Sequence, residues 1–276
     1  SPFSFPKSHD VAARGAQGAA GQFVRHLGEH GQVSILTNCR GQLLTGMKRP
    51  IAADASFIHR RQHLSTDLST RLQSAPVVPL VGEDDPATAV AVTKALAAGG
   101  LTVIEVVLRS DNAQAGMEAI LAQTEGLAVG AGTVLTLDQA KSVVASGAQF
   151  IVCPGLVDNI AEYCLAEGIP FFPGTMTAGE VQRAYAMGLR EVKFFPAALA
   201  GGVPMLKAFS SVFREMRFMP TGGVSAGNLT EFLSVPSVIA CGGSWLTPAN
   251  AIAAGEYDKV TALASEAVAI AKSVRP

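Results

Sequence analysis

Residues 191–196 read Glu-Val-Lys-Phe-Phe-Pro, a short apolar run that holds one lysine and ends at a proline. Val192, Phe194 and Phe195 are residue types typical of a buried strand. Lys193, between them, would have little access to water, and desolvation favours the neutral form of an amine. A neutral amine in an apolar pocket attacks a carbonyl carbon and forms a Schiff base. The structural alternative, a strand-end lysine paired with a carboxylate, stays open at this point because such ion pairs are common.

The regions on both sides of this run repeat one pattern, a short apolar strand followed by a helix. We expect strands at 77–81, 103–108, 128–134, 150–153, 171–173, 191–195, 217–219 and 238–241. We expect helices at 86–98, 112–123, 137–146, 158–167, 178–187, 204–211, 228–233 and 257–274. Short, continuously apolar strands are typical of parallel sheets covered on both faces. Eight such units in about 200 residues predict an α/β fold of the (β/α)8 TIM-barrel type. An open doubly wound sheet is the runner-up, weakened because no Gly-x-Gly-x-x-Gly motif follows the first strand.

The first part of the chain lacks this pattern. Residues 1–75 hold nine Lys or Arg and four Asp or Glu, whereas residues 76–276 hold twelve and eighteen. We expect a low-order, disordered N-terminal extension over 1–63 and the barrel over 64–276, with an amphipathic helix at 66–74 leading into it. The extension has three interpretations: an organelle-targeting segment, a disordered tail, or upstream sequence before an internal start at Met47. The last two are favoured. Binding of a partner protein by residues 1–75 is a further alternative.

The composition argues against several classes of protein and of catalytic site. No apolar run is long enough to span a membrane, and the basic first part lacks the interleaved aromatic residues of a nucleic-acid-binding segment. None of the four cysteines forms a Cys-x-x-Cys pair, so we expect free thiols in the cytoplasm, with organelle targeting by residues 1–60 left open. The cysteine spacing also predicts no metal site. All five histidines lie in residues 1–75, so a barrel enzyme here must use Glu, Asp, Lys, Tyr or water for proton transfer.

Polar residues at the ends of the expected strands form the candidate site, because barrel active sites lie where the strands end. These residues are Glu105, Arg109, Thr133, Lys193, Thr221 and Ser244. Of the six lysines in residues 76–276, only Lys193 falls in an expected strand, which favours the catalytic interpretation. Glu105 and Arg109 have equal parity and share one face of their strand. They suit a general base and a carboxylate-binding arginine, although a structural Glu–Arg pair stays open.

Paired glycines follow the last two expected strands. Gly222 and Gly223 come after the seventh strand, and Gly242, Gly243 and Ser244 come after the eighth. Barrels often bind phosphate in these two loops through backbone N–H groups and a nearby helix N-terminus. Glycine lets the backbone approach the anion closely. Tight turns without a ligand are the structural alternative for either pair.

Seven short motifs occur in order along the expected barrel. They are Pro-Val-Val-Pro at 76–79, Ile-Glu-Val-Val-Leu-Arg at 104–109, Gly-Ala-Gly-Thr-Val at 130–134, Pro-Gly-Leu at 154–156, Lys-Phe-Phe-Pro-Ala at 193–197, Pro-Thr-Gly-Gly at 220–223 and Gly-Gly-Ser-Trp-Leu at 242–246. Together they resemble the class I 2-keto-3-deoxy-6-phosphogluconate aldolases, which also act as 4-hydroxy-2-oxoglutarate aldolases. The resemblance covers residues 76–270 and says nothing about residues 1–60.

The resemblance implies a role for each matching residue. Lys193 would be the Schiff-base lysine and Glu105 the general acid and base. The implied substrate-binding residues are Arg109, Thr133, Pro154, Phe195 and Thr221, and the implied phosphate-binding residues are Gly222, Gly223, Gly243 and Ser244. It also implies a homotrimer that uses no metal and no cofactor.

The implied reactions are cleavage of 2-keto-3-deoxy-6-phosphogluconate to pyruvate and glyceraldehyde 3-phosphate, and of 4-hydroxy-2-oxoglutarate to pyruvate and glyoxylate. The alternatives are an aldolase for the epimer 2-keto-3-deoxy-6-phosphogalactonate and a non-catalytic barrel that binds sugar acids or phosphate. Three residues depart from the family pattern: Val107 replaces a threonine, Cys153 a serine and Ala198 a glutamate. None of these changes removes a proposed catalytic group.

Overall fold

The computed structural model describes residues 67–275, in which nine short strands alternate with helices. The strands are β1 Val77–Val81, β2 Val103–Val107, β3 Ala128–Gly132, β4 Ile151–Val152, β5 Phe171–Phe172, β6 Gly174–Thr175, β7 Glu191–Phe194, β8 Arg217–Pro220 and β9 Cys241–Gly243. The helices are α2 Pro86–Ala98, α3 Ala113–Gln123, α4 Leu137–Ala145, α5 Asp158–Glu167, α6 Ala178–Ala186, α7 Gly202–Val212, α8 Ala226–Leu233, α9 Ala249–Ala253 and α10 Tyr257–Val274. The expected extension over 1–63 lies outside the described residues.

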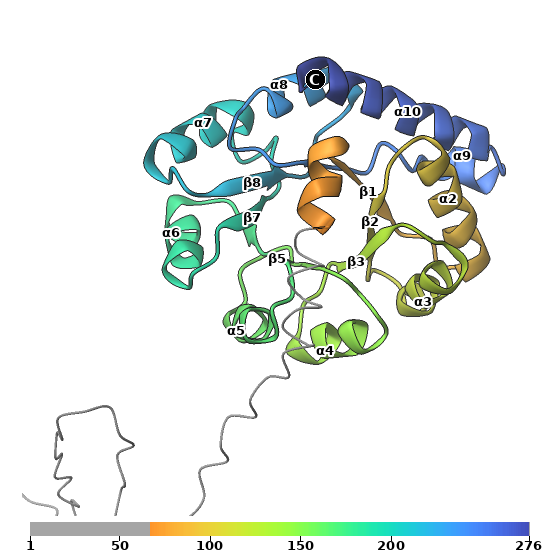
Figure 1. Cartoon of the computed structure of the whole chain (residues 1–276), viewed down its shortest axis with the longest axis horizontal. Helices are drawn as coiled ribbons and strands as arrows, with labels where there is room; N and C mark the ends of the chain where they lie inside the picture. The colour runs from red at the N-terminus through yellow and green to blue at the C-terminus, as the bar shows by residue number, and fades with distance from the viewer. Residues whose placement is uncertain (1–66, 276) are drawn as a thin grey trace, which may run out of the picture. The chain divides into compact units, whose positions relative to one another are not determined.

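All paired strands run parallel. One sheet has the order β5-β4-β3-β2-β1-β9 and the other the order β6-β7-β8. Isolated parallel bridges join Phe218 to Val238 and Thr221 to Gly242, which link β8 to the β9 region. At the other junction the Lys193 N–H donates a hydrogen bond of 2.9 Å to the carbonyl of Pro173, between β5 and β6. The α/β class with parallel strands is therefore confirmed, and Figure 1 shows the helices arranged around the outside of the strands.

Two expected strands differ from the structure. The fifth, at 171–173, is divided into β5 and β6 around Pro173, which has no N–H to donate to a neighbouring strand. The eighth, at 238–241, is wrong in its position, because β9 runs from Cys241 to Gly243. Pairing with β1, where Val78 is opposite Gly242, holds these glycines in a strand despite their low strand propensity. The other six strands are confirmed to within two residues.

Six of the expected helices begin within one residue of the predicted position, whereas α7 and α8 begin two residues earlier, at Gly202 and Ala226. Asp85 caps α2 by accepting a hydrogen bond of 2.8 Å from the Thr88 N–H, and Pro86 is the first helical residue. The expected helix at 66–74 is present over residues 67–74 of the described chain. The short helix α9 was not expected from the sequence, since five residues carry too little periodicity. No helix within residues 67–275 is both long and apolar enough to cross a membrane.

Alternate side chains of the strands belong to two apolar cores, as the period of a strand requires. The larger core, with Val81, Ile104 and Val192, lies between the strands and the surrounding helices. The smaller core contains residues at the beginnings of the strands, such as Val78 and Val103, together with Leu68 and Leu72 of the helix at 67–74. In Figure 1 this helix, drawn in orange, lies in front of the strands and covers their N-terminal ends.

Candidate active site

Lys193 on β7 and Glu105 on β2 meet in the protein interior. The Lys193 Nζ lies 3.4 Å from the Glu105 Oε1, and the residues are 4% and 0% exposed. The second carboxylate oxygen, Oε2, is buried and has no hydrogen-bond partner within residues 67–275. The Lys193 Nζ also lies 5.3 Å from the centre of the half-buried Phe195 ring. The site therefore holds a buried amine, a carboxylate within proton-transfer distance and one free acceptor oxygen.

Glycines on neighbouring strands create the space for this pair. Gly132 on β3 is adjacent to Glu105, and a Cβ there would lie 2.1 Å from the Glu105 Oε1. Gly174 on β6 is paired with Lys193, and a Cβ there would lie 2.0 Å from the Pro154 carbonyl oxygen. Sequence reasoning assigned no role to Gly132 or Gly174. A glycine within a strand was the available signal, because it often marks a close approach.

Arg109 and Thr133 lie together beyond the ends of β2 and β3. The Arg109 Nε donates a hydrogen bond of 3.3 Å to the Thr133 Oγ1, and the Arg109 side chain is exposed. Thr133 has a φ of 58°, in the left-handed region, and is the only described non-glycine residue with a positive φ. Glu105 pairs with Lys193 and not with Arg109, so the structural Glu105–Arg109 pair left open by the sequence is not found. An arginine with an exposed guanidinium beside a hydroxyl suits a substrate carboxylate.

Thr221 is buried at the end of β8 and faces β9. Its Oγ1 donates a hydrogen bond of 3.4 Å to the Met219 carbonyl. A Cβ on Gly242 would lie 2.2 Å from the Thr221 Oγ1. Pro154, after β4, is half-buried, like Phe195. The structure thus places every predicted substrate-binding residue at or just beyond a strand end, although it shows no direct contact between Thr221 and Lys193.

The glycine pairs after β8 and in β9 have different conformations. Gly222 and Gly223 have φ values of 91° and 80°, which glycine adopts without strain. Gly223 also packs closely on Ala198, whose Cβ would lie 2.4 Å from an added Cβ. Helix α8 begins at Ala226, directly after this turn, so its unpaired N–H groups lie nearby.

Gly243, by contrast, is not in a loop. It is buried within β9, and a Cβ there would lie 2.1 Å from the Trp245 ring. Ser244 follows it and is exposed. The expectation that both Gly242 and Gly243 follow a strand is therefore wrong, and the first residue beyond β9 is Ser244.

Cys153, at the end of β4, differs from the family pattern but does not add a nucleophile. Burial, and then the nearby Cys164, raise the pKa of its thiol to about 12. It is therefore protonated at neutral pH and unreactive. In the part of the chain that the structure describes, no group of three or more His, Cys, Asp and Glu residues is arranged to hold a metal ion.

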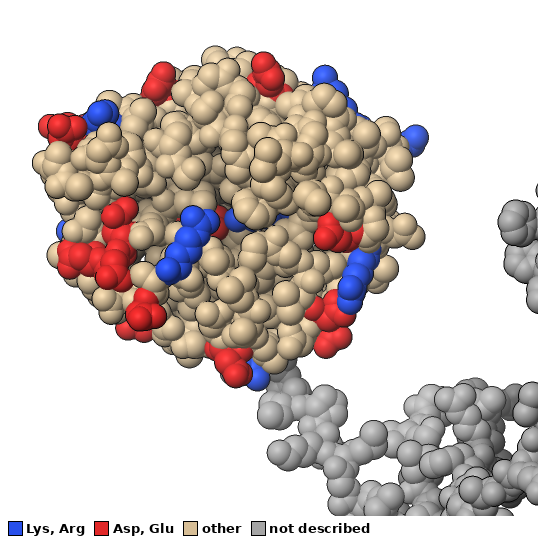
Figure 2. Space-filling model, turned by 180° about the vertical axis from the view of Figure 1, so that it is seen from behind, with Lys and Arg blue, Asp and Glu red and all other residues tan. Residues whose placement is uncertain are grey.

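The face that carries these strand ends is opposite the helix at 67–74. Figure 2 shows it with a basic side chain lying beside a central hollow, where small patches of acidic and basic atoms are visible. A polar, charged opening over a buried Lys–Glu pair is the arrangement of a site for a small anionic substrate.

The family model described as KDPG and KHG aldolase matches residues 68–263 of this chain. The KHG/KDPG aldolase of Escherichia coli K12 is 43% identical over 207 residues, which are 75% of this chain and 97% of that protein. The relatives therefore correspond to about three quarters of the present chain.

Two solved structures are similar in fold and sequence. The 2-keto-3-deoxy-6-phosphogluconate aldolase of Zymomonas mobilis ZM4, solved with 3-phosphoglycerate, has a TM-score of 0.70 and 38% identity. The match covers 76% of this chain and 99% of that one. The KDPG aldolase of Legionella pneumophila has a TM-score of 0.69 and 38% identity, with 71% and 96% covered. That structure holds pyruvate captured as a covalent carbinolamine intermediate.

Proposed function

The chain belongs to the KDPG and KHG aldolase family, and we propose that it is a class I aldolase that cleaves 2-keto-3-deoxy-6-phosphogluconate to pyruvate and glyceraldehyde 3-phosphate. The same site would cleave 4-hydroxy-2-oxoglutarate to pyruvate and glyoxylate. The observation that carries the proposal is the buried Lys193–Glu105 pair, with its atoms 3.4 Å apart. Such a pair supplies a nucleophile and a proton acceptor without a metal.

The first half of the reaction forms the iminium. Glu105 accepts a proton from the Lys193 ammonium, and the free amine adds to the C2 ketone to give a carbinolamine. The protonated Glu105 returns its proton to the departing hydroxyl, so that water leaves and a protonated C=N bond remains on Lys193. The structure of the Legionella pneumophila relative, with pyruvate captured as a covalent carbinolamine, supports this step.

The second half breaks the C3–C4 bond. Glu105, again a carboxylate, takes the proton of the C4 hydroxyl, and the bond electrons flow to the iminium nitrogen. The aldehyde leaves and a pyruvate enamine stays on Lys193. Glu105 then protonates C3, and water hydrolyses the resulting iminium to release pyruvate and the amine. The free Oε2 of Glu105 is the acceptor that this step needs, because Oε1 is occupied by Lys193.

Substrate binding follows from the surroundings of this pair. We propose that Arg109 and Thr133 bind the substrate carboxylate, while Pro154, Phe195 and Thr221 contact the carbon chain. The phosphate would lie at Gly222, Gly223, Gly243 and Ser244, where glycine backbone and the first turn of α8 offer N–H groups. The exposed Ser244 is its hydroxyl donor.

We also propose that the two sheets close into one (β/α)8 barrel in which β5 and β6 act as a single strand. The parallel bridges from β8 to the β9 region and the hydrogen bond from Lys193 to Pro173 support closure at both junctions. As the family resemblance implies, the enzyme would be a homotrimer. A cytoplasmic location agrees with Cys153, Cys164 and Cys241 being free thiols.

Reductive trapping tests the proposal. Incubation with pyruvate and borohydride should reduce the iminium and add one pyruvyl group, and mass spectrometry should find it on the peptide that contains Lys193. Lys193→Ala should abolish the labelling. A label on another lysine would contradict the assignment of Lys193. No label on the wild type would contradict the Schiff-base mechanism and favour a non-catalytic barrel.

The sugar epimer is a separate question. Values of kcat/KM for the phosphogluconate and phosphogalactonate substrates should favour the former if the first assignment is correct. A preference for the galactonate epimer would replace the substrate but leave the chemistry of Lys193 and Glu105 unchanged.

A further inference from the structure

Strand β7, which carries Lys193, has little support on the side of β6. β6 consists of two residues, Gly174 and Thr175, and Gly174 is the residue opposite Lys193. Gly174 has no side chain to pack beside the lysine. Pro173, which precedes it, has no N–H to donate to β7. The backbone around Lys193 therefore depends on the few hydrogen bonds that residues 173–175 can still make.

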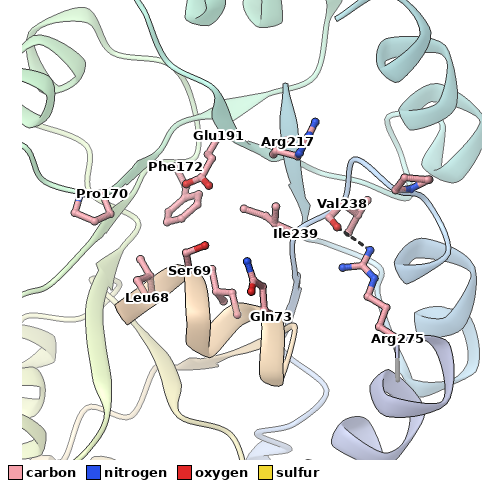
Figure 3. A pocket seen from close by; sticks show the side chains of 12 residues that line it. Leu68, Ser69, Gln73, Pro170, Phe172, Glu191, Arg217, Val238, Ile239 and Arg275 are labelled. Atoms are coloured by element: carbon pink, nitrogen blue, oxygen red, sulfur yellow. Dashed lines mark hydrogen bonds between the residues drawn. The ribbon is translucent and has the colours of Figure 1, made fainter. Parts of the chain in front are cut away.

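Side-chain packing below Lys193 is also incomplete. Glu191, two residues before it on β7, lines a cavity of about 230 Å3 at the N-terminal ends of the strands, together with Phe172 of β5 (Figure 3). A cavity offers no protein atoms to contact, so dispersion attraction holds this part of the strand less firmly than a filled core would. Hydrogen bonds to neighbouring strands become correspondingly more important for the position of β7.

The Thr175 hydroxyl makes one of these hydrogen bonds to the backbone of Lys193 itself. Its Oγ1 donates to the Lys193 carbonyl over 3.1 Å, and the two residues are 2% and 4% exposed. The Lys193 N–H donates to the Pro173 carbonyl over 2.9 Å, and the Phe195 N–H donates to the Thr175 carbonyl over 3.1 Å. The peptide groups before and after Lys193 are thus both bonded to residues 173–175.

We infer that Thr175 is a positioning residue for the reaction, an inference that rests on the proposed function. By holding the Lys193 carbonyl, the hydroxyl fixes the direction of the Cα–Cβ bond and hence the path of the side chain toward Glu105. The distance of 3.4 Å between the Lys193 Nζ and the Glu105 Oε1 is already long for a hydrogen bond. A small rotation of this peptide group would carry the amine out of reach of the carboxylate, and small misplacements of reacting groups are costly in rate.

A buried hydroxyl also needs an acceptor for purely structural reasons, so the variants must separate loss of position from loss of stability. Thr175→Val keeps the shape of the side chain and removes the donor, whereas Thr175→Ser keeps the donor. Thr261→Val is the matched control. The Thr261 Oγ1 donates to the Ala95 carbonyl over 3.0 Å, between α10 and α2 and outside the proposed site.

The measurement is the rate of adduct formation on the full chain. Each variant is mixed with pyruvate and quenched with borohydride at successive times, at a temperature where all are folded. At saturating pyruvate, Thr175→Val should label Lys193 about tenfold more slowly, a change equivalent to about one hydrogen bond. The pyruvate concentration for half-maximal rate should not change, because Arg109 and Thr133 are intact. Thr175→Ser should recover most of the rate, and Thr261→Val should react like the wild type.

Three results would overturn the inference: a wild-type rate in Thr175→Val, an equal loss of rate in Thr261→Val, or no recovery in Thr175→Ser. The second would trace the effect to stability and the third to the shape of the side chain. Absence of any adduct on the wild type would instead contradict the proposed function. A wild-type adduct on Lys193 that forms at the same rate in Thr175→Val removes only the role of Thr175.

Discussion

At the scale of single residues, the role of Glu105 distinguishes a catalytic site, which cleaves a carbon–carbon bond, from a site that only binds its ligand. It is fully buried, and its Oε1 is occupied by Lys193 while its Oε2 is free. Both oxygens therefore have a use in the proposed reaction, one for the amine and one for the C4 hydroxyl. A purely structural ion pair would need only the first.

Glu105→Gln should keep the shape of the site but remove the base. We expect kcat for carbon–carbon cleavage to fall by about 10²–10⁴-fold, the usual contribution of a general base. Some borohydride trapping of pyruvate should persist, because Lys193 is still present. Glu266→Gln, an exposed change on α10, should leave kcat unchanged. Wild-type cleavage by Glu105→Gln would show that another group is the base.

The surroundings of Gly243 make it unsuitable as a mutational probe of phosphate binding. Substitution by aspartate would introduce a carboxylate near the expected phosphate, but the added Cβ would lie 2.1 Å from the Trp245 ring. The resulting packing defect would affect all substrates alike. Ser244 is exposed and follows β9, so its substitution by aspartate introduces the charge without that steric cost.

Ser244→Asp should therefore raise KM for 2-keto-3-deoxy-6-phosphogluconate at least about tenfold, because a carboxylate repels the phosphate. The KM for 4-hydroxy-2-oxoglutarate, which carries no phosphate, should change much less. Ser244→Asn is the uncharged control. Steady-state kinetics that show equal changes for both substrates would remove the phosphate from this end of the site.

At the scale of elements, the helix at 67–74 closes the interior of the sheet at its N-terminal side. Leu68 and Leu72, four residues apart, present one apolar face to Val78, Val103 and other residues of the smaller core. Each leucine is 5% exposed. The helix is thus part of the folded unit and not only a connection to it.

Leu72→Ala should destabilise the protein by about 2–5 kcal/mol, the usual cost of removing a buried leucine. Thermal or urea unfolding should show the loss, with Gln73→Ala, an exposed change in the same helix, as the control. Trapping at Lys193 should survive at temperatures where the variant is folded. An unchanged unfolding midpoint would mean that the helix does not contribute to the core.

At the scale of the whole molecule, the family match begins at residue 68, within the helix at 67–74. We propose that residues 64–276 form the complete aldolase domain and that residues 1–63 are not needed for it. Leu68 and Leu72 are buried, so we expect a deletion that removes them to destabilise the folded unit.

Deletion of residues 1–62 should leave kcat, the melting temperature and the oligomeric state nearly unchanged. Sedimentation equilibrium of both forms should give three chains per particle. Deletion of residues 1–75, which also removes the helix at 67–74, should lower the melting temperature strongly. A large fall already in the first deletion would show that residues 1–62 pack on the folded unit.

Most of the elements, and Lys193 as the central residue, could be predicted from the sequence, whereas β9 was misplaced and α9 was not expected. Alternating apolar strands and helices predicted a parallel α/β fold, and Asp85 with Pro86 marked a helix start that the structure confirms. Lys193 was selected because it is the one lysine in an expected strand. These conclusions depend on local patterns, whose period is a few residues, so they can be read without knowing which segments meet.

The partners of these residues could not be predicted and follow from the tertiary fold. Glu105 pairs with Lys193, 88 residues away, and not with Arg109, four residues away. Gly132 provides the space for that carboxylate, and β9 forms at Cys241–Gly243 because β1 lies beside it. The physical reason is that these contacts depend on strand register and on which distant strands lie side by side. The pattern of a single strand specifies which of its side chains share a face, but not which residues that face will contact.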